Sequence, residues 1–335
     1  MKFTHSLIAK AVLIASFFAT VLMISGCGTA GQQLQSTAAS STPITTPITN
    51  PAPTPTPAPA PTPVSGIPQS SHVVLVIEEN HRFDEVYPNG MPWLSAEGIK
   101  YGYTTNYHAD EPGSALDYFW LSSGSGEQAF GCSGDGCPNP ITSDNIFREL
   151  GRAGLTWKVY AQGLPSVGYM GTSSGAYVAR HNPAKWYSDV INSPALQRNM
   201  VPFTQFAADM AANQLPNYSI IVPDVDNDAH DGTVGQADTF LKNNVAPLLN
   251  TPSFQAGGDG LMFITFDECD GAVGACPEQV FTAVIGPKVT KSCVIPGLDV
   301  TTAQTPGQDT KRRLVCPQKW RVKRGRDEGR SGYRE

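Results

Sequence analysis

Groups able to bind a hard cation follow three apolar segments of the chain. The segments span residues 72–78, 219–222 and 261–266, and the groups after them are carboxylates, one amide and one imidazole: Glu79, Asn80, Asp228, His230, Asp267 and Glu268. Carboxylates held close together repel one another unless a cation neutralises them, and oxygen donors with an occasional imidazole suit hard or borderline divalent metals. Asp and Asn after a strand are also common turn residues and helix caps, so each group alone is weak evidence. The three sets together predict a metal site.

The elements that must position these groups alternate between strand and helix. Five short apolar runs predict buried strands: 72–78, 156–160, 219–222, 261–266 and 280–285. Helical patterns lie between them at 143–152, 202–213 and 235–249, the last interrupted near Pro247. This alternation predicts an α/β fold whose mostly parallel central sheet is covered on both faces. Functional groups in such folds gather beyond the carboxyl ends of the strands, where the cation-binding groups fall.

Composition and charge limit the class of protein. Hydrophobic residues make up 40% of the 335 residues and charged residues only 16%, which a wholly disordered chain of high net charge would not show. The formal net charge of -6 argues against a nucleic-acid partner. The charge is uneven, because residues 311–335 hold ten Lys or Arg and three Asp or Glu.

The first 70 residues predict export and tethering to a membrane. Two lysines precede an apolar run at 11–24, which has the length of a signal-peptide core. The run ends in Ile-Ser-Gly-Cys27, which resembles the lipobox of bacterial lipoproteins, so Cys27 is predicted to be lipidated; an ordinary secretory signal is the alternative. Residues 1–27 are therefore assigned to the signal and residues 28–70, rich in Pro, Thr and Ala, to a disordered, extended spacer.

Six further cysteines favour disulfide bonds over metal binding in an exported protein. Two local pairings are predicted, and the two cysteines nearest the C-terminus are left without an assigned partner: Cys132 with Cys137, Cys269 with Cys276, and then Cys293 and Cys316. Sequence spacing does not fix the connectivity of the first four.

The strand-end motifs resemble those of the bacterial phosphoesterase family, which includes acid phosphatases and phosphatidylcholine-type phospholipases C. Residues 73–84 look like its opening motif, and the later motifs match in order: 221–223 with 227–232, then 266–268. Residues 163–168 and 181–183 are similar to the middle region of the family's mycobacterial secreted acid phosphatases. The likeness covers roughly residues 71–288. It implies a catalytic domain over 71–291 with an alkaline-phosphatase-like, three-layer α/β/α sandwich.

The resemblance also implies roles for individual residues. A divalent metal, with Mg, Ca, Mn and Fe all left open, is held by four side chains: Glu79, Asn80, Asp267 and Glu268. The family's His-Pro-Ser stretch, followed by Asn-Tyr, aligns with residues 112–118 and makes Ser114 the nucleophile. His230 and His181 are implied as catalytic, His230 as the acid that protonates the leaving alcohol, and Asn80 and Asp228 as substrate-binding. The plainer alternatives are a helix-capping His230, a surface-loop His181 and a loop Ser114.

Three features depart from the family pattern, and a fourth, Gln279, departs from that of the wider superfamily. Pro112 stands where the family has a histidine, and Asp117 stands where it has an asparagine. Gln279 occupies the position of a further metal histidine in the wider superfamily, which favours one metal over two. Residues 292–335 lack the family's closing segment and become strongly basic, so they are predicted to be a disordered tail, and a lost reading frame near Lys291 is one hypothesis for it.

Taken together, these features predict an exported, lipid-anchored, metal-dependent phosphomonoesterase of the acid phosphatase type. Its substrates are phosphate esters, with phosphatidylinositol 3-phosphate among those the resemblance implies, and a monomer is expected. A phospholipase C-type phosphodiesterase is less favoured, because that branch of the family commonly has longer chains. A catalytically impaired, lipid-anchored phosphate-binding protein is the alternative from another class.

Overall fold

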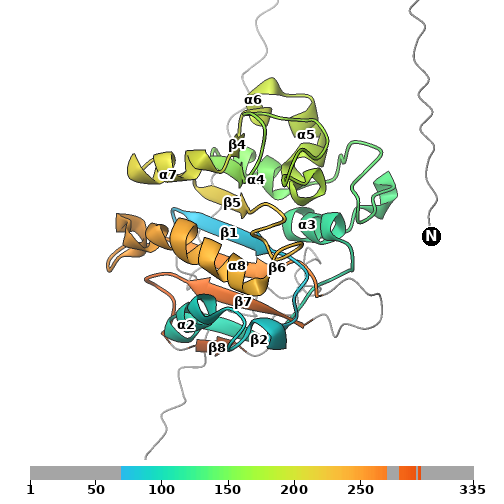
Figure 1. Cartoon of the computed structure of the whole chain (residues 1–335). Coiled ribbons are helices and arrows are strands. Elements are labelled where there is room, and N and C mark those ends of the chain that lie inside the picture. Colours follow the sequence, from blue (N-terminus) through green and yellow to red (C-terminus); the bar gives the residue numbers. More distant parts are fainter. Residues whose placement is uncertain (1–68, 270–278, 292, 296–335) are drawn as a thin grey trace, which may run out of the picture. The chain divides into compact units, whose positions relative to one another are not determined.

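The computed structural model describes residues 69–269, 279–291 and 293–295. The described strands form one eight-stranded sheet in the order β4-β3-β5-β1-β6-β7-β2-β8 (Figure 1). Their bounds are β1 Val73–Glu78, β2 Gly102–His108, β3 Trp157–Ala161, β4 Met200–Pro202, β5 Tyr218–Val222, β6 Leu261–Phe266, β7 Gln279–Ile285 and β8 Cys293–Ile295.

The sheet is mostly parallel, as the sequence predicts. Strand β1 lies at its centre and pairs in parallel with β5 on one side and β6 on the other. Within the described sheet only β7 runs the other way, pairing antiparallel with both β6 and β2. The carboxyl ends of β5, β1 and β6 therefore meet at one edge of the sheet, and all five predicted strands are confirmed.

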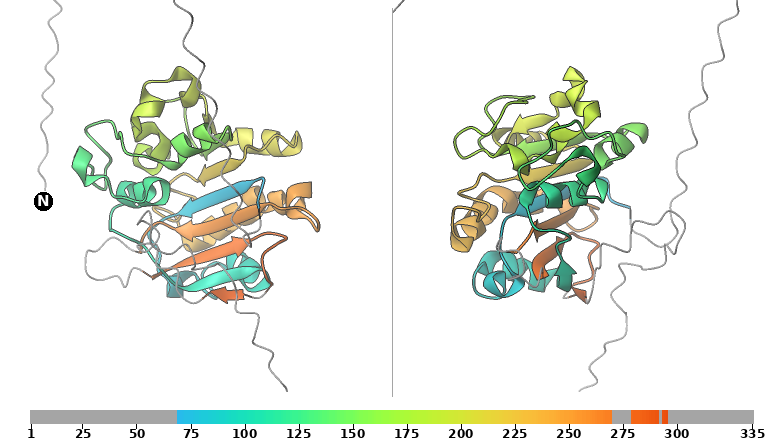
Figure 2. Two further views of the ribbon diagram at one scale, coloured as in Figure 1. Left: turned by 180° about the vertical axis from the view of Figure 1, so that it is seen from behind. Right: turned by 90° about the vertical axis from the view of Figure 1, so that its right-hand side faces the viewer.

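Helices cover both faces of the sheet and complete the predicted α/β/α sandwich (Figures 1 and 2). Side chains of β1 alternate between two cores: Val74 and Val76 pack with α2 and α8, whereas Leu75 and Ile77 pack with α3 and α4. This alternation follows from the two-residue period of a strand. The helices of the first face are α1 Phe83–Val86, α2 Pro92–Lys100, α7 Thr204–Ala211 and α8 Val234–Phe240; those of the second are α3 Ser114–Ser123, α4 Ile146–Arg152, α5 Ser188–Ile191 and α6 Pro194–Gln197.

The three predicted helices are present with shorter bounds. Helix α4 begins after Asn145, whose side chain accepts a hydrogen bond from the Arg148 N–H at 3.0 Å and so caps the helix. The long helix predicted at 235–249 is regular only through α8, and then continues as a π turn over Leu241–Val245 and a 3-10 turn over Ala246–Asn250. The irregularity begins at Leu241, ahead of Pro247, which lies in the 3-10 turn and has no backbone N–H to donate.

Several predictions concern residues outside the described ranges. The signal, Cys27, the spacer and residues 296–335 fall there, so their assignments remain predictions. In the part of the chain that the structure describes, no helix is long and apolar enough to cross a membrane. The Cys132–Cys137 disulfide is confirmed, whereas Cys276 lies outside the described residues. Strand β8 pairs in parallel with β2 and belongs to the sheet, although its residues fall at the start of the predicted tail.

Candidate active site

Backbone contacts hold together the chain segments that leave β1, β5 and β6. The Glu79 N–H donates to the Asp228 carbonyl oxygen at 2.7 Å. The Asn80 N–H donates to Asp267 Oδ1 at 3.1 Å. Asn80 has a φ of 59°, in the left-handed region that asparagine tolerates better than most residues. The chain therefore turns immediately after β1, and the fully buried Glu79 side chain lies beside the groups from the two neighbouring strands.

Ser114 is the first residue of α3, the ten-residue helix that meets this edge of the sheet. Its Oγ donates a hydrogen bond to Glu79 Oε2 at 3.0 Å. The preceding Gly113 N–H donates to Glu268 Oε2 at 2.8 Å, so the helix N-terminus faces carboxylates. Gly113 has a φ of 115°, and an added Cβ would come within 2.9 Å of the Gly134 Cα. Glycine is required here both by conformation and by space.

A cluster of buried carboxylates surrounds this helix terminus. Asp117, Asp267 and Glu268 each offer an oxygen, and these oxygens lie within 4.8 Å of one another. Burial and the charge of Glu268 raise the pKa of Asp267 to about 7. Burial, with repulsion from Asp267 and Glu268, raises the pKa of Asp117 to about 10. Burial, with repulsion from Asp267 and Asp228, raises the pKa of Glu79 as well. Raised pKa values of this kind arise where buried carboxylates repel one another more than the surrounding donors stabilise them.

The donor set fits a divalent cation. Asp267 Oδ2 and Asp117 Oδ2 are buried oxygens with no hydrogen-bond partner among the described residues. Buried carboxylate oxygens without partners are costly unless a counter-charge compensates them. Hard oxygen ligands of this kind are those that Mg²⁺, Ca²⁺ and Mn²⁺ prefer.

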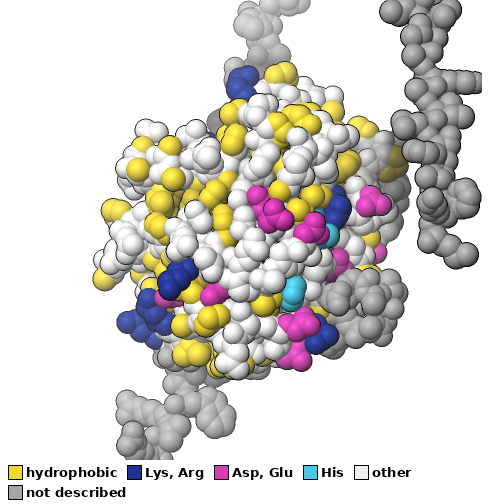
Figure 3. All heavy atoms as spheres, viewed as in Figure 1, with side chains coloured by type: hydrophobic (Ala, Val, Ile, Leu, Met, Phe, Trp, Pro, Cys, Tyr) yellow, Lys and Arg dark blue, Asp and Glu magenta, His cyan; other side chains and the backbone are white. Residues whose placement is uncertain are grey.

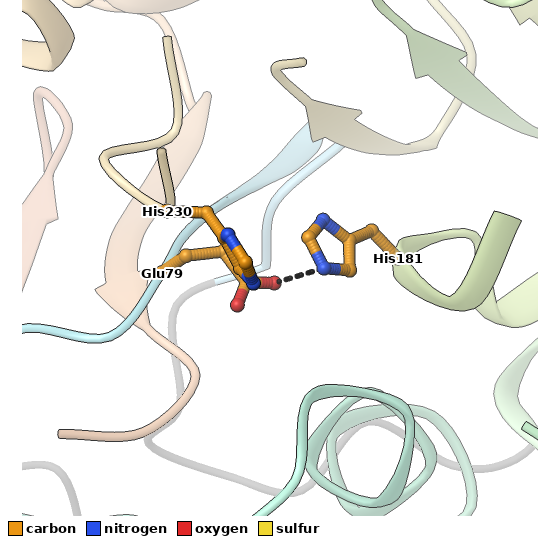
Figure 4. Close-up of side chains that lie close together, drawn as sticks. All are labelled: Glu79, His181 and His230. Carbon is orange, nitrogen blue, oxygen red and sulfur yellow. Dashed lines mark ion pairs between the residues drawn. The ribbon is translucent and has the colours of Figure 1, made fainter. Parts of the chain in front are cut away.

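His181 lies between two carboxylates of the site. Its Nε2 is 3.2 Å from Glu79 Oε1 (Figure 4). Its Nδ1 is 3.2 Å from Asp228 Oδ2. The ring also stacks on Tyr118, with centroids 5.5 Å apart. His181 is only 1% exposed, so the surface-loop alternative is wrong. Burial, with repulsion from Arg180 and His230, holds the pKa of His181 well below its usual range.

His230 lies beside His181, with ring centroids 5.5 Å apart, and is partly exposed. Its Nε2 is 2.9 Å from an Arg180 Nη atom, and its Nδ1 is 2.7 Å from Asp231 Oδ1. A guanidinium only donates, so in this arrangement Nε2 accepts and Nδ1 carries the proton given to Asp231. Thr233 caps α8 in its place, accepting a hydrogen bond from the Gln236 N–H, which contradicts the helix-capping alternative for His230.

The structure brings together every catalytic, substrate-binding and metal residue that the sequence predicts. On the face drawn in Figure 3, acidic side chains and histidine atoms lie close together, on the side toward which β1 and β6 run in Figure 1. Asp228 completes the group, since its Oδ1 accepts a hydrogen bond from the His230 N–H at 2.8 Å. Gln279, which stands where the wider superfamily has a further metal histidine, donates from its side-chain amide to the Thr105 carbonyl oxygen of β2 at 2.6 Å.

Sequence reasoning missed Arg180 and Tyr118, which contact the two histidines. Arg180 directly precedes His181, and Tyr118 follows Ser114 by one helical turn. Their places beside predicted site residues are the signal by which the sequence could have identified them. Asp117 was noted only as a departure from the family pattern, although its carboxylate lies within the cluster.

Residues 88–292 match the model of the Phosphoesterase family, and the chain belongs to this family. Curated relatives include a phosphatidylinositol-3-phosphatase of Mycobacterium tuberculosis, 30% identical over 210 residues that make up 62% of this chain and 67% of the relative. A probable acid phosphatase of Kluyveromyces lactis is 29% identical over 228 residues, 63% of this chain and 50% of the relative. The chain thus spans about two thirds of the mycobacterial relative and about half of the yeast one.

Similar solved structures include a protein of the alkaline phosphatase superfamily from Vibrio parahaemolyticus, with a TM-score of 0.45 and 11% identity over 68% of this chain and 62% of that chain. The lipoteichoic acid synthase of Listeria monocytogenes gives a TM-score of 0.41 and 11% identity over 68% of this chain and 66% of that chain.

Proposed function

We propose that this protein is an exported, metal-dependent phosphoric monoester hydrolase in which Ser114 is the nucleophile. The observation that carries the proposal is the hydrogen bond from Ser114 Oγ to Glu79 Oε2, made at the N-terminus of α3 inside a carboxylate cluster. Membership of the Phosphoesterase family supports phosphoric-ester chemistry. The relatives named as acid phosphatases support a monoester over a diester.

Four side chains would hold the cation: Glu79, Asn80, Asp267 and Glu268. When bound, a divalent cation lowers the pKa of a neighbouring hydroxyl and stabilises negative charge on phosphoryl oxygens. The buried Asp267 Oδ2, which has no partner among the described residues, supports a bound positive charge most directly. Metal analysis of the purified protein would identify the cation among Mg, Ca, Mn and Fe.

The side chains of the site can carry out a two-step displacement. Ser114 Oγ attacks phosphorus, its proton passes to the hydrogen-bonded Glu79 carboxylate, and the bond from phosphorus to the leaving oxygen breaks. His230, protonated on Nε2 once its bond to Arg180 opens, gives that proton to the leaving alcohol, and Arg180 then pairs with phosphoryl oxygens. Water then attacks the phosphoserine and gives a proton to His230, the bond from phosphorus to Oγ breaks, phosphate leaves, and Glu79 returns its proton to Ser114 Oγ. His181 and Asp228 orient the substrate and the Glu79 carboxylate.

The relatives and the N-terminal sequence support the proposed substrate and location. The name of the mycobacterial relative makes phosphatidylinositol 3-phosphate the first lipid to test. Lipidation at Cys27 would hold the enzyme at a membrane surface of the cell envelope, where such an ester is accessible.

The test compares the wild-type chain with Ser114→Ala on a phosphomonoester and on a phosphodiester, each with added Mn²⁺. We expect the wild type to prefer the monoester and Ser114→Ala to lose at least about 10³-fold in kcat/KM. Ser133→Ala, which changes an exposed serine, is the matched control and should keep wild-type activity. A Ser114→Ala variant as active as wild type would exclude this nucleophile. Metal binding without turnover of any phosphate ester would favour a phosphate-binding protein.

A further inference from the structure

Asp117 is a buried carboxylate with an unused oxygen. The residue is 2% exposed. Its Oδ1 accepts a long hydrogen bond of 3.4 Å from the Glu111 N–H, whereas its Oδ2 has no partner among the described residues. Burying an ionised oxygen without a partner is strongly destabilising. A group of this kind is kept where something charged compensates it.

The unused oxygen of Asp117 belongs to a cluster that contains a second one. Ligand oxygens of Asp117, Asp267 and Glu268 lie within 4.8 Å of one another, and Asp267 Oδ2 is likewise buried without a partner. Two unpartnered acidic oxygens in one small space point to a shared positive charge.

Helix α3 brings Asp117 to the cluster by its spacing from Ser114. Residues three apart lie on the same side of a helix, so Asp117 and Ser114 both face the carboxyl edge of the sheet. The family resemblance places an asparagine at this position. Asparagine would offer the cluster a neutral amide, whereas Asp117 adds a full negative charge at the same distance from the backbone.

We propose that Asp117 is a direct, anionic ligand of the cation held by Asp267 and Glu268. This inference rests on the metal site of the proposed function and adds a ligand to it. The added charge and the flexible, oxygen-only donor set favour a tightly bound, hard divalent cation. The competing role is a neutral, protonated Asp117 that acts as an asparagine would, without contacting the metal.

The experiment measures metal binding to the full chain, stripped of metal, rather than turnover. Mn²⁺ is titrated calorimetrically into wild type, Asp117→Asn and Asp135→Asn. Asp135 is an exposed acid in the loop beside the start of α3, so its variant controls for the loss of one charge. We expect Asp117→Asn to weaken Mn²⁺ binding at least about 10-fold and Asp135→Asn to change it less than about 2-fold.

A second measurement counts water molecules on a bound Tb³⁺ by its luminescence lifetimes in H₂O and D₂O. Replacing the carboxylate by a shorter side chain should add about one bound water in Asp117→Ser, and Asp135→Asn should add none, whereas Asp117→Asn keeps an amide oxygen that can stay bound. Asp117→Ser, which also removes the carboxylate, replaces Asp117→Asn if that variant does not fold, as judged by its circular dichroism.

The outcomes separate this inference from the proposed function. Unchanged Mn²⁺ affinity and an unchanged water count in the Asp117 variants would overturn the inference alone, provided that Asp267→Asn still abolishes binding. A wild-type chain that binds no Mn²⁺ would overturn the inference and the metal dependence of the proposed function together. A wild-type chain that binds Mn²⁺ tightly through Asp117 but hydrolyses no phosphate ester would overturn only the proposed function.

Discussion

Two buried aspartates of this protein, Asp209 and Asp267, differ in the partners that the fold gives them. Asp209 on α7 is 5% exposed and accepts hydrogen bonds from Lys158, Tyr160 and Gln205. Although burial opposes it, these bonds hold the pKa of Asp209 below its usual value. Asp267 is 3% exposed, its Oδ1 accepts the Asn80 and Glu268 N–H groups, its side-chain neighbours include the Glu79 carboxyl, and its pKa is raised.

This contrast separates an acid that hydrogen-bond donors of its own chain satisfy from an acid that is proposed to bind a cation. Both residues have little solvent exposure, so exposure alone does not separate them. A structural acid is satisfied by cations and donors of its own chain, whereas Asp267 keeps an oxygen without a partner beside other carboxylates. Whether every oxygen of a buried carboxylate has a hydrogen-bond partner therefore separates the structural acid from the proposed metal ligand.

The largest effect that would sharpen this comparison comes from Asp267→Asn. The variant keeps the side-chain oxygen that accepts the Asn80 and Glu268 N–H groups but loses the charge, so kcat/KM should fall at least about 10³-fold while the metal-free protein stays folded. The matched variant Asp209→Asn should show the reverse pattern, losing stability and keeping kcat. Steady-state kinetics and thermal unfolding of both variants test this. Equal losses of activity in the two would break the distinction.

In metal-free protein, Asp267 and Asp209 should make the free energy of unfolding depend on pH in opposite directions. This effect is smaller than the loss of activity expected for Asp267→Asn. The folded pKa of Asp267, about 7, lies above its ordinary value of 3.8, so the native state binds more protons than the unfolded state between these limits. The free energy of unfolding therefore falls as pH rises through this window, and Mn²⁺ should remove the loss. Asp209, whose pKa is lowered, contributes stability that is lost as pH falls below its ordinary value.

Urea unfolding between about pH 3 and about pH 8, with and without Mn²⁺, measures both contributions. Asp267→Asn should flatten the decline between about pH 4 and about pH 7 and leave the acid limb unchanged. A wild-type, metal-free protein that grows more stable across that window would contradict the assignment of uncompensated charge to the site.

The smallest effect is expected for Lys158→Met. The Lys158 side chain is 28% exposed, and Asp209 keeps Tyr160 and Gln205 as donors, so the free energy of unfolding should fall by only about 1 kcal/mol near neutral pH. The loss should shrink in acid, where Asp209 becomes protonated. Urea unfolding at both pH values checks it, and a loss comparable with that of Asp209→Asn would show that the two neutral donors contribute little.

The central strands were predictable because strands buried on both faces are continuous apolar runs, as in β1 and β6. Three strands escaped prediction: β2, β4 and β8. The sequence of β2, GYTTNYH, is polar, while β4 and β8 have three residues each. Helix α3 escaped because seven of its ten residues are buried, which removes the polar face that helical spacing relies on. It carries Ser114, so the proposed nucleophile came only from the family resemblance.

Which acids end which strands can be read from the order of the amino acids, because the carboxyl ends of neighbouring parallel strands share one edge whatever the loops do. How those acids are satisfied depends on the three-dimensional fold. It brought Arg180 to His230 and placed His181 between Glu79 and Asp228. It also left Asp117 and Asp267 each with an unpartnered oxygen. The physical reason is that a hydrogen bond or an ion pair depends on distances of about 3 Å between atoms far apart in the chain, and no local pattern encodes them.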